Sequence, residues 1–115
     1  MFDLEERAAL FGEEIIVFAK SIVRDEVTRP LIGQIVRSGT SIGSNYMEAV
    51  GAESKKDIHH KIALCKQESK ETKHWLRMIA KADPPRKPDC QRLWVEAKEL
   101  TLIFSSILLS KKTLL

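Results

Sequence analysis

Hydrophobic residues recur along most of the chain at intervals of three and four residues, the spacing that places side chains on one face of an α-helix. Four such runs are separated by short polar or proline-containing segments. The runs comprise Leu4, Ala8, Phe11, Ile15, Phe18 and Ile22; Leu31, Ile35, Ser38, Ile42, Asn45 and Ala49; Ile58, Ile62, Cys65, Ser69, Thr72, Leu76 and Ile79; and Leu93, Ala97, Leu100, Phe104 and Ile107. This pattern predicts four helices, each with one buried face.

Capping residues predict where the first two helices begin and end. Asp3 and Glu6 have the spacing of a capping box at the start of the first helix. The segment 28–30 is expected to end that helix, and Pro30 suits the first turn of the second one. Gly51 is expected to end the second helix.

The third helix is predicted to begin after Ser54, which forms an acidic variant of the capping box with Asp57. Segment 83–89 contains three prolines and is predicted to be a loop. Asp89 is then expected to cap the last helix.

The middle of the second helix is rich in small residues, including Gly39 and Gly43. Each glycine costs about 1 kcal/mol relative to alanine inside a helix, so a loop over residues 38–44 is an alternative. We favour a continuous helix, because the hydrophobic spacing keeps its register across the segment. The small residues would then let a neighbouring helix approach closely.

Length and composition agree with a single helical domain over residues 1–115. The chain has 115 residues, of which 43% are hydrophobic, 30% charged and only 6% aromatic. One domain of this size is typical, and enough of the chain is hydrophobic to build a core. Long helices joined by short connections predict the all-α class, as an antiparallel up-down-up-down four-helix bundle.

The sequence carries no signal for export or membrane insertion. Its N-terminus lacks the pattern of a signal peptide, and no run of about 18 hydrophobic residues occurs. Two cysteines, Cys65 and Cys90, cannot form a dense disulfide framework. We therefore expect a cytoplasmic location and no membrane partner.

Several hydrophobic residues of the first and last helices lie outside the predicted buried face. They are Ile16, Val17, Val23, Leu102, Ile103, Leu108 and Leu109. A wide hydrophobic core and scattered surface residues would account for some of them. Because a hydrophobic surface beyond one face usually marks a protein contact, we predict a homo-oligomer.

No pattern of catalytic or metal-binding residues emerges. The residues that bind metals most readily are His59, His60, Cys65, His74 and Cys90, and none has another of the five at the helical spacing of three or four. Glu71 and His74 form a single Glu-x-x-His pair, whereas di-iron bundles use two. We expect no metal, no cofactor and no enzymatic activity.

Asn45 falls on the buried face of the second helix, where an amide is costly unless it is hydrogen-bonded. Glu48 lies one turn further on, and Glu71 and Thr72 of the third helix are expected nearby. Such a polar cluster would fix the register of the two helices, the interpretation that we favour. The alternative is a small ligand or ion held between them.

Charge is distributed unevenly along a chain of net charge +3. Residues 1–29 contain seven acids and four bases, whereas residues 53–82 contain eight bases and four acids. Five bases of the third helix recur every three or four residues and would line one side of it: Lys66, Lys70, Lys73, Arg77 and Lys81. We call these five residues the basic stripe.

Two interpretations of the basic stripe remain open. It would bind consecutive phosphates of RNA or DNA, with Lys61 and His74 extending it. Alternatively, it is a solvated flank whose lysines pair with Glu68 and Glu71 at helical spacing. A ring of several copies would strengthen the first interpretation, because repeated stripes act together.

Two segments resemble a known bacterial family, the four-helix bundle proteins encoded within intervening sequences of large-subunit ribosomal RNA genes. The first resemblance rests on Arg37, Ser41, Ile42, Asn45, Glu48 and Ala49. The second rests on Ile62, Ala63, Leu64, Glu68, Glu71, Thr72, Trp75 and Leu76. The likeness extends over residues 5–110, with matching helix lengths.

This resemblance implies an antiparallel bundle that assembles as a ring, typically a homopentamer, and signature positions at Arg37, Asn45 and Glu48. A related protein, the accessory variability determinant of diversity-generating retroelements, is a basic pentameric ring that partners a reverse transcriptase and its template RNA. By similarity, the stripe residues Lys66, Lys70, Lys73 and Arg77 would contact nucleic acid. The sequence thus predicts a non-enzymatic RNA-binding scaffold, or alternatively an accessory subunit that binds only protein.

Overall fold

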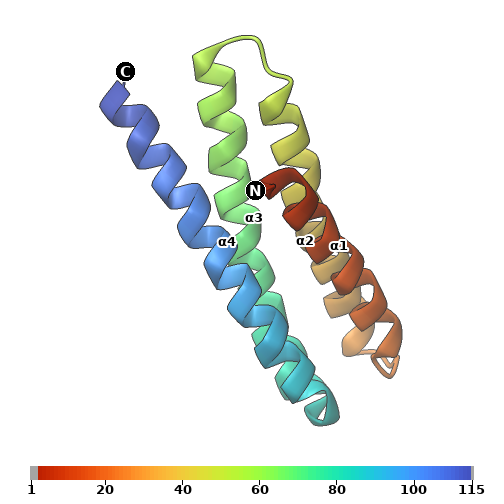
Figure 1. Ribbon diagram of the computed structural model, residues 1–115. Coiled ribbons are helices and arrows are strands. Elements are labelled where there is room, and N and C mark those ends of the chain that lie inside the picture. The colour runs from red at the N-terminus through yellow and green to blue at the C-terminus, as the bar shows by residue number, and fades with distance from the viewer. Residues whose placement is uncertain (1–2, 115) are drawn as a thin grey trace.

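In a computed structural model, the chain forms four long α-helices and one short 3-10 turn (Figure 1). The structure describes residues 3–114, with side chains for residues 3–110. The helices are α1 (Leu4–Ser21), α2 (Thr28–Val50), α3 (Lys55–Ala82) and α4 (Lys87–Leu114), and the turn η1 (Pro84–Arg86) precedes α4. Successive helices run in opposite directions, and the described part of the chain contains no strand. The predicted all-α class and the four helices are confirmed.

The predicted hydrophobic faces form the core. Nearly all residues of the four runs are buried, and only Leu31, Asn45, Ile58 and Ile107 are half-buried. The largest fully buried side chains include Phe11, Phe104 and Leu76. Helical spacing of hydrophobic residues was therefore a sufficient guide to which side of each helix is buried.

The predicted caps of α1 and α3 are confirmed by hydrogen bonds. Asp3 accepts a bond from the backbone N–H of Glu6 at 3.1 Å, and Ser54 accepts one from Asp57 at 3.0 Å. Gly51 ends α2 as predicted, with its N–H donating back to the last turn. Each cap satisfies a backbone group that the helix itself leaves without a partner.

The predicted end of the first helix was wrong, because α1 stops at Ser21 instead of continuing to residues 28–30. A compact turn replaces the last helical residues. The Asp25 carboxylate accepts hydrogen bonds from the backbone N–H groups of Val27 and Thr28, both at 2.8 Å. The Thr28 hydroxyl donates to the carbonyl of Val23 at 2.7 Å. These local bonds compete with helix formation and lead the chain into α2.

The predicted loop at residues 83–89 is shorter than expected. Residues 84–86 form η1, and α4 already begins at Lys87. Asp89 consequently lies inside the first turn of α4 and is not its cap, and its carboxylate is 3.4 Å from Arg86. Pro88 fits within this first turn because the N–H groups there have no helical partner.

The small-residue segment of α2 is continuous helix, as favoured from the hydrophobic register. It packs against α1 at short range, because a Cβ atom on Gly39 would lie 2.9 Å from two side-chain carbons of Ile15. A Cβ atom on Gly43 would meet the backbone of Ala8 at 3.6 Å. The glycines are therefore used for a close approach between two helices.

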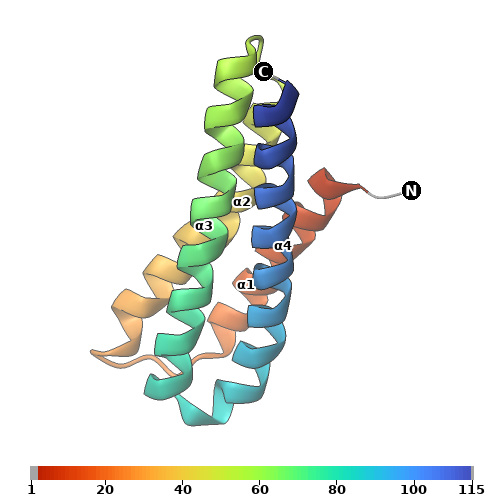
Figure 2. The ribbon, with the colours of Figure 1, turned by 90° about the vertical axis from the view of Figure 1, so that its left-hand side faces the viewer.

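The four helices are not all of the same length, and they differ in how far they extend along the bundle. α1 is the shortest of the four α-helices, and it is inclined to α4 (Figure 2). Its N-terminal end lies partway along the bundle, so the C-terminal parts of α2 and α4 extend beyond it (Figures 1 and 2). This leaves one end of the bundle open, as described below.

Candidate nucleic-acid interface

The structure places two residues of the basic stripe, Lys73 and Arg77, on the flank of α3 that faces α4. Lys66 and Lys70 instead line a shallow hollow formed by residues of α3 alone, which also include Glu71 and His74. The five residues of the stripe are half-buried or exposed, as their spacing beside the buried face requires. The ammonium of Lys73 is 5.3 Å from the ring centre of Trp94 on α4. Arg77 lines a groove between α3 and α4 together with Lys87 and Trp94.

The carboxylates expected to neutralise this stripe bind another residue. Glu68 and Glu71 face α2, where each forms an ion pair with Arg37 at 3.0 Å. The Arg37 guanidinium donates a hydrogen bond to each of these carboxylates and so links α2 to α3. Among the described residues, no member of the basic stripe forms an ion pair. The predicted pairing of the stripe with Glu68 and Glu71 was wrong.

The Arg37 site perturbs the ionisation of its members. Burial raises the pKa of Glu68, and its hydrogen bond with Glu71 adds to this, although Arg37 acts in the opposite direction. Burial would lower the pKa of Arg37, but the hydrogen bonds and charges of the two carboxylates outweigh it and raise that pKa. Arg37 thus compensates for two carboxylates packed close together.

α4 adds further cations to the same face, which the sequence interpretation did not include. Lys98 lies 5.7 Å from the ring centre of Trp94, and Lys87 lines the α3–α4 groove. The spacing of Lys87, Trp94 and Lys98 at intervals of seven and four was the signal in the sequence that could have identified them. The face between α3 and α4 is therefore more basic than the stripe alone.

The acids of α4 point to its other flank. Glu96 accepts a hydrogen bond from Arg7 of α1 at 2.7 Å, and Glu99 lies 3.6 Å from the same guanidinium. The hydrogen bond that Arg7 donates to Glu96 raises the pKa of Arg7, and this effect outweighs the opposing effect of burial. Glu96 and Glu99 thus lie toward α1, away from the groove between α3 and α4 that Lys87 and Trp94 line.

The two predicted extensions of the stripe have different surroundings. Lys61 forms a 2.7 Å ion pair with Glu48 of α2 and faces away from the stripe. His74 is exposed and lies edge-on to Trp75, with ring centres 4.9 Å apart. Lys61 is consequently not a member of the basic face.

The predicted polar cluster at Asn45 is not a cluster. Asn45 is half-buried and donates from Nδ2 to the carbonyl of Ser41 at 2.9 Å, within its own helix. Thr72 is buried and donates to the hydroxyl of Ser38 at 2.9 Å. Glu48 and Glu71 bind Lys61 and Arg37 as described above. Asn45, Glu48, Glu71 and Thr72 therefore each bind a different group, and they do not bind one another.

The cysteines are buried and unpaired. Burial raises the pKa of Cys65 to about 12 and that of Cys90 to about 11, far above the ordinary range of a reactive thiol. Within residues 3–110, no three acidic, histidine or cysteine side chains come together in a way that could hold a metal. Both cysteines therefore serve as small core residues.

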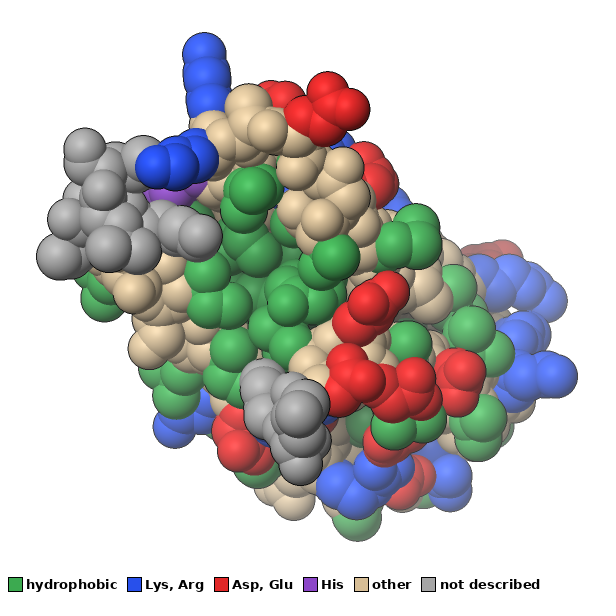
Figure 3. All heavy atoms as spheres, turned by 45° about the horizontal axis from the view of Figure 1, so that its top comes forward, with side chains coloured by type: hydrophobic (Ala, Val, Ile, Leu, Met, Phe, Trp, Pro, Cys, Tyr) green, Lys and Arg blue, Asp and Glu red, His purple; other side chains and the backbone are tan. Residues whose placement is uncertain are grey.

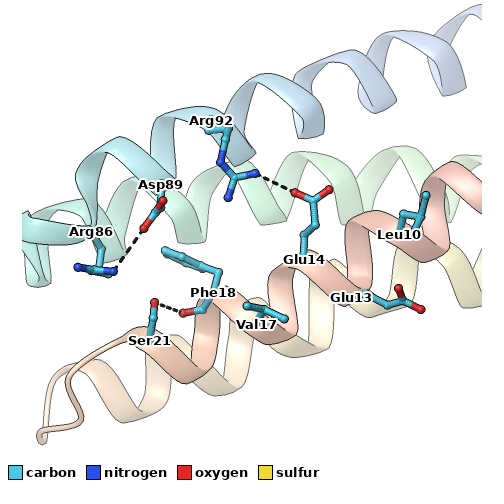
Figure 4. Close-up of a pocket in the computed structure, with 9 residues that line it drawn as sticks. All are labelled: Leu10, Glu13, Glu14, Val17, Phe18, Ser21, Arg86, Asp89 and Arg92. Atoms are coloured by element: carbon cyan, nitrogen blue, oxygen red, sulfur yellow. Dashed lines mark hydrogen bonds and ion pairs between the residues drawn. The ribbon is translucent and has the colours of Figure 1, made fainter.

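A second hollow lies between α1 and the start of α4, with a volume of about 430 Å³ (Figure 4). Arg92 forms a 2.8 Å ion pair with Glu14, and Arg86 pairs with Asp89. Figure 4 shows Phe18 between these pairs. Because both arginines already have carboxylate partners, this hollow is a weaker anion site than the α3–α4 face.

The open end of the bundle exposes hydrophobic residues. Figure 3 shows them gathered in a depression at that end. We call this depression the end groove; it is lined by Leu4, Tyr46, Leu102, Ile103, Ser106 and Ile107. Among the residues predicted to lie outside the core, Ile16, Val17, Val23, Leu102 and Leu109 are exposed, whereas Ile103 and Leu108 pack partly against it.

These features define the class of protein: an all-helical bundle with a polar seam between α2 and α3 and a basic face between α3 and α4. The chain belongs to the family of 23S rRNA-intervening sequence proteins, which it matches over residues 2–106. The match includes both segments on which the resemblance rested.

A solved structure supports the same assignment. The chain is similar to a protein of unknown function from the S23 ribosomal protein family of Bacteroides thetaiotaomicron VPI-5482, with 26% identity and a TM-score of 0.84. The similarity covers 92% of this chain and 98% of the other. No curated protein matches the sequence. None of the described helices is long and hydrophobic enough to span a membrane.

Proposed function

We propose that this protein is a non-enzymatic, cytoplasmic scaffold that binds RNA through the basic face between α3 and α4. The observation that carries the proposal is that the five stripe residues have no ion-pair partner among the described residues, although Glu68 and Glu71 lie on the same helix. Cations held close together without counter-charges favour binding of a polyanion, because each phosphate contact releases counterions.

Self-assembly is the second part of the proposal. Exposed hydrophobic residues of α1 and α4 and the end groove are surfaces that a second copy would cover. The family resemblance favours a ring of five copies. Since each chain carries a net charge of +3, five would carry about +15, and their stripes would bind one RNA together.

Charge reversal on the stripe tests the RNA-binding proposal. The variant Lys70→Glu with Lys73→Glu is expected to weaken binding of bacterial RNA at least tenfold at low salt and to make affinity less dependent on salt. Fluorescence anisotropy at several salt concentrations measures both quantities.

A matched control makes the same change of net charge elsewhere. Lys20→Glu with Arg29→Glu alters two exposed bases of α1 and α2, outside the α3–α4 face. It should retain most of the affinity if the stripe is the binding site. Equal losses in both variants, or none in either, would show that the stripe is not a specific site.

The alternative function is that of an accessory subunit that binds only protein, a reverse transcriptase being one example. The end groove favours this alternative, because a hydrophobic depression suits a protein partner better than a phosphate backbone. Binding to a single partner protein that persists at high salt, without any retention of RNA, would support it.

A further inference from the structure

Trp94 is placed unusually for an aromatic residue of a helical bundle. It lies on α4 at the α3–α4 groove and retains 36% of its surface exposed. Among the other described phenylalanine, tyrosine and tryptophan side chains, Phe11, Phe18 and Phe104 are buried and Tyr46 and Trp75 are half-buried, so Trp94 is the most exposed of them. An exposed indole costs the chain hydrophobic burial, so its position calls for a reason in function or in packing.

The surroundings of Trp94 combine a hydrophobic hollow with unpaired cations. The α3–α4 groove has a volume of about 490 Å³ and includes Leu76, Ala80 and Val95 in its lining. Lys73 and Lys98 hold their ammonium groups 5.3 and 5.7 Å from the indole centre. Neither lysine has a carboxylate partner among the described residues.

From this arrangement we infer that the nucleic acid bound at the α3–α4 face is single-stranded, and that Trp94 stacks against one of its unpaired bases. The inference rests on the proposed function, since it specifies which nucleic acid the basic face selects. A duplex keeps its bases stacked inside the helix and cannot offer a free base face to an indole.

A base that stacks on Trp94 would displace the ammonium groups of Lys73 and Lys98 from the ring, and the relative strength of the two interactions favours the base. A cation–π contact at an exposed site is weak, whereas stacking of a base on an aromatic side chain is the stronger interaction. The ammonium groups of Lys73 and Lys98 displaced from the ring would remain close enough to pair with the phosphates that flank the stacked base. Gln91, which also lines the groove, supplies an amide for the edge of the base.

Substitution of Trp94 tests the inference directly. Trp94→Ala should weaken binding of a short single-stranded RNA about tenfold and leave binding of a matched RNA duplex unchanged. Trp94→Phe keeps an aromatic ring and should recover most of the loss. The salt dependence of both variants should equal that of the original protein, because no phosphate contact is removed. Met47→Ala, which truncates an exposed hydrophobic residue of α2 outside the α3–α4 groove, is the matched control and should have no effect.

Fluorescence provides a second, independent readout. Trp75→Phe removes the other indole, whose Nε1 has no hydrogen-bond partner among the described residues, so that little is lost. In this background single-stranded RNA should quench the emission of Trp94, with the same midpoint as the anisotropy titration. Duplex RNA should not.

The outcomes separate the two proposals. Failure of the original protein to bind either RNA would overturn both. Binding that is retained by Trp94→Ala, or that falls equally for single strand and duplex, would overturn the stacking inference and leave the basic face intact. A change of oligomeric state in Trp94→Ala, measured by light scattering, would identify Trp94 as a contact between copies and would also overturn it.

Discussion

At the level of single residues, the contact between α1 and α2 depends on the missing side chain of Gly39. Its backbone faces Ile15, a fully buried residue that cannot move aside at its branched carbon. Gly33 lies six residues earlier on the same helix, and a Cβ atom there would meet nothing within 4 Å. The two glycines therefore have opposite expected responses to the same substitution.

Gly39→Ala should lower the free energy of unfolding by roughly 1 kcal/mol, since overpacking of a core costs about 1–3 kcal/mol and the gain in helix propensity returns about 1 kcal/mol. Gly33→Ala should raise it by about 0.5–1 kcal/mol, because only the propensity changes. Urea denaturation of the two variants measures both. Stabilisation by Gly39→Ala would mean that α1 and α2 are not in close contact.

The buried thiols give a second prediction at this level. With pKa values of about 12 and about 11, Cys65 and Cys90 should be almost entirely protonated at neutral pH. We expect the native protein to react with a disulfide reagent at least about a hundredfold more slowly than the denatured chain. The reaction is followed by absorbance, with and without denaturant. Rapid labelling of one thiol in the native state would contradict its burial.

At the level of helices, α2 and α3 are joined along one flank by Arg37 and the two carboxylates of α3. Arg37→Ala should lower the free energy of unfolding by about 1 kcal/mol at neutral pH, since the pairs are partly exposed to solvent. Arg37→Lys keeps the charge but not the fork that reaches both carboxylates, and should recover only part of the loss.

The loss in Arg37→Ala should depend on pH in a defined direction. Arg37 lowers the pKa of Glu68, so its removal raises the folded-state pKa of a carboxyl whose pKa burial has already raised. A carboxyl with a raised folded-state pKa binds its proton more tightly when folded, so its cost to folding begins above the unfolded-state pKa and is complete above the folded-state pKa. The effect of the substitution should therefore be full at about pH 7 and should shrink towards about pH 4. A constant difference between the two pH values would argue against the ion pairs.

At the level of the whole molecule, the inclined and short α1 leaves the end groove without a covering helix. Leu102 is 58% exposed at its margin. Because a charge is costly in a contact between hydrophobic surfaces, Leu102→Glu should dissociate the proposed ring without loss of helical content. Val27→Glu, in the connection before α2, is the matched control, because Val27 is 63% exposed and distant from the groove.

Size-exclusion chromatography with light scattering measures the oligomeric state, and circular dichroism the helical content. The original protein and Val27→Glu are expected to have the mass of a ring, and Leu102→Glu that of a monomer. A monomeric original protein would contradict self-assembly, and a Leu102→Glu variant that stays assembled would place the contact on another surface.

The sequence alone determined the four helices, their buried faces and the basic stripe, because each depends on periodic spacing within one helix. Hydrophobic residues every three or four positions must share a face, and so must lysines with the same spacing. The continuity of α2 through Gly39 and Gly43 followed from the same rule. The end of α1 did not follow from this rule, because the periodic pattern continues to Ile22. The helix ends at Ser21, and hydrogen bonds of the Asp25 and Thr28 side chains form a turn after it.

Only the tertiary structure decided which flank of each helix faces which neighbour. Spacing allowed Glu68 and Glu71 to pair with lysines of α3, but the rotation of α3 against α2 brings Arg37 to both of them. The same packing separates Asn45 from Thr72 and brings Lys73 to Trp94. These pairings join residues far apart in the chain, so they depend on how helices cross and rotate, which a pattern within one helix does not specify.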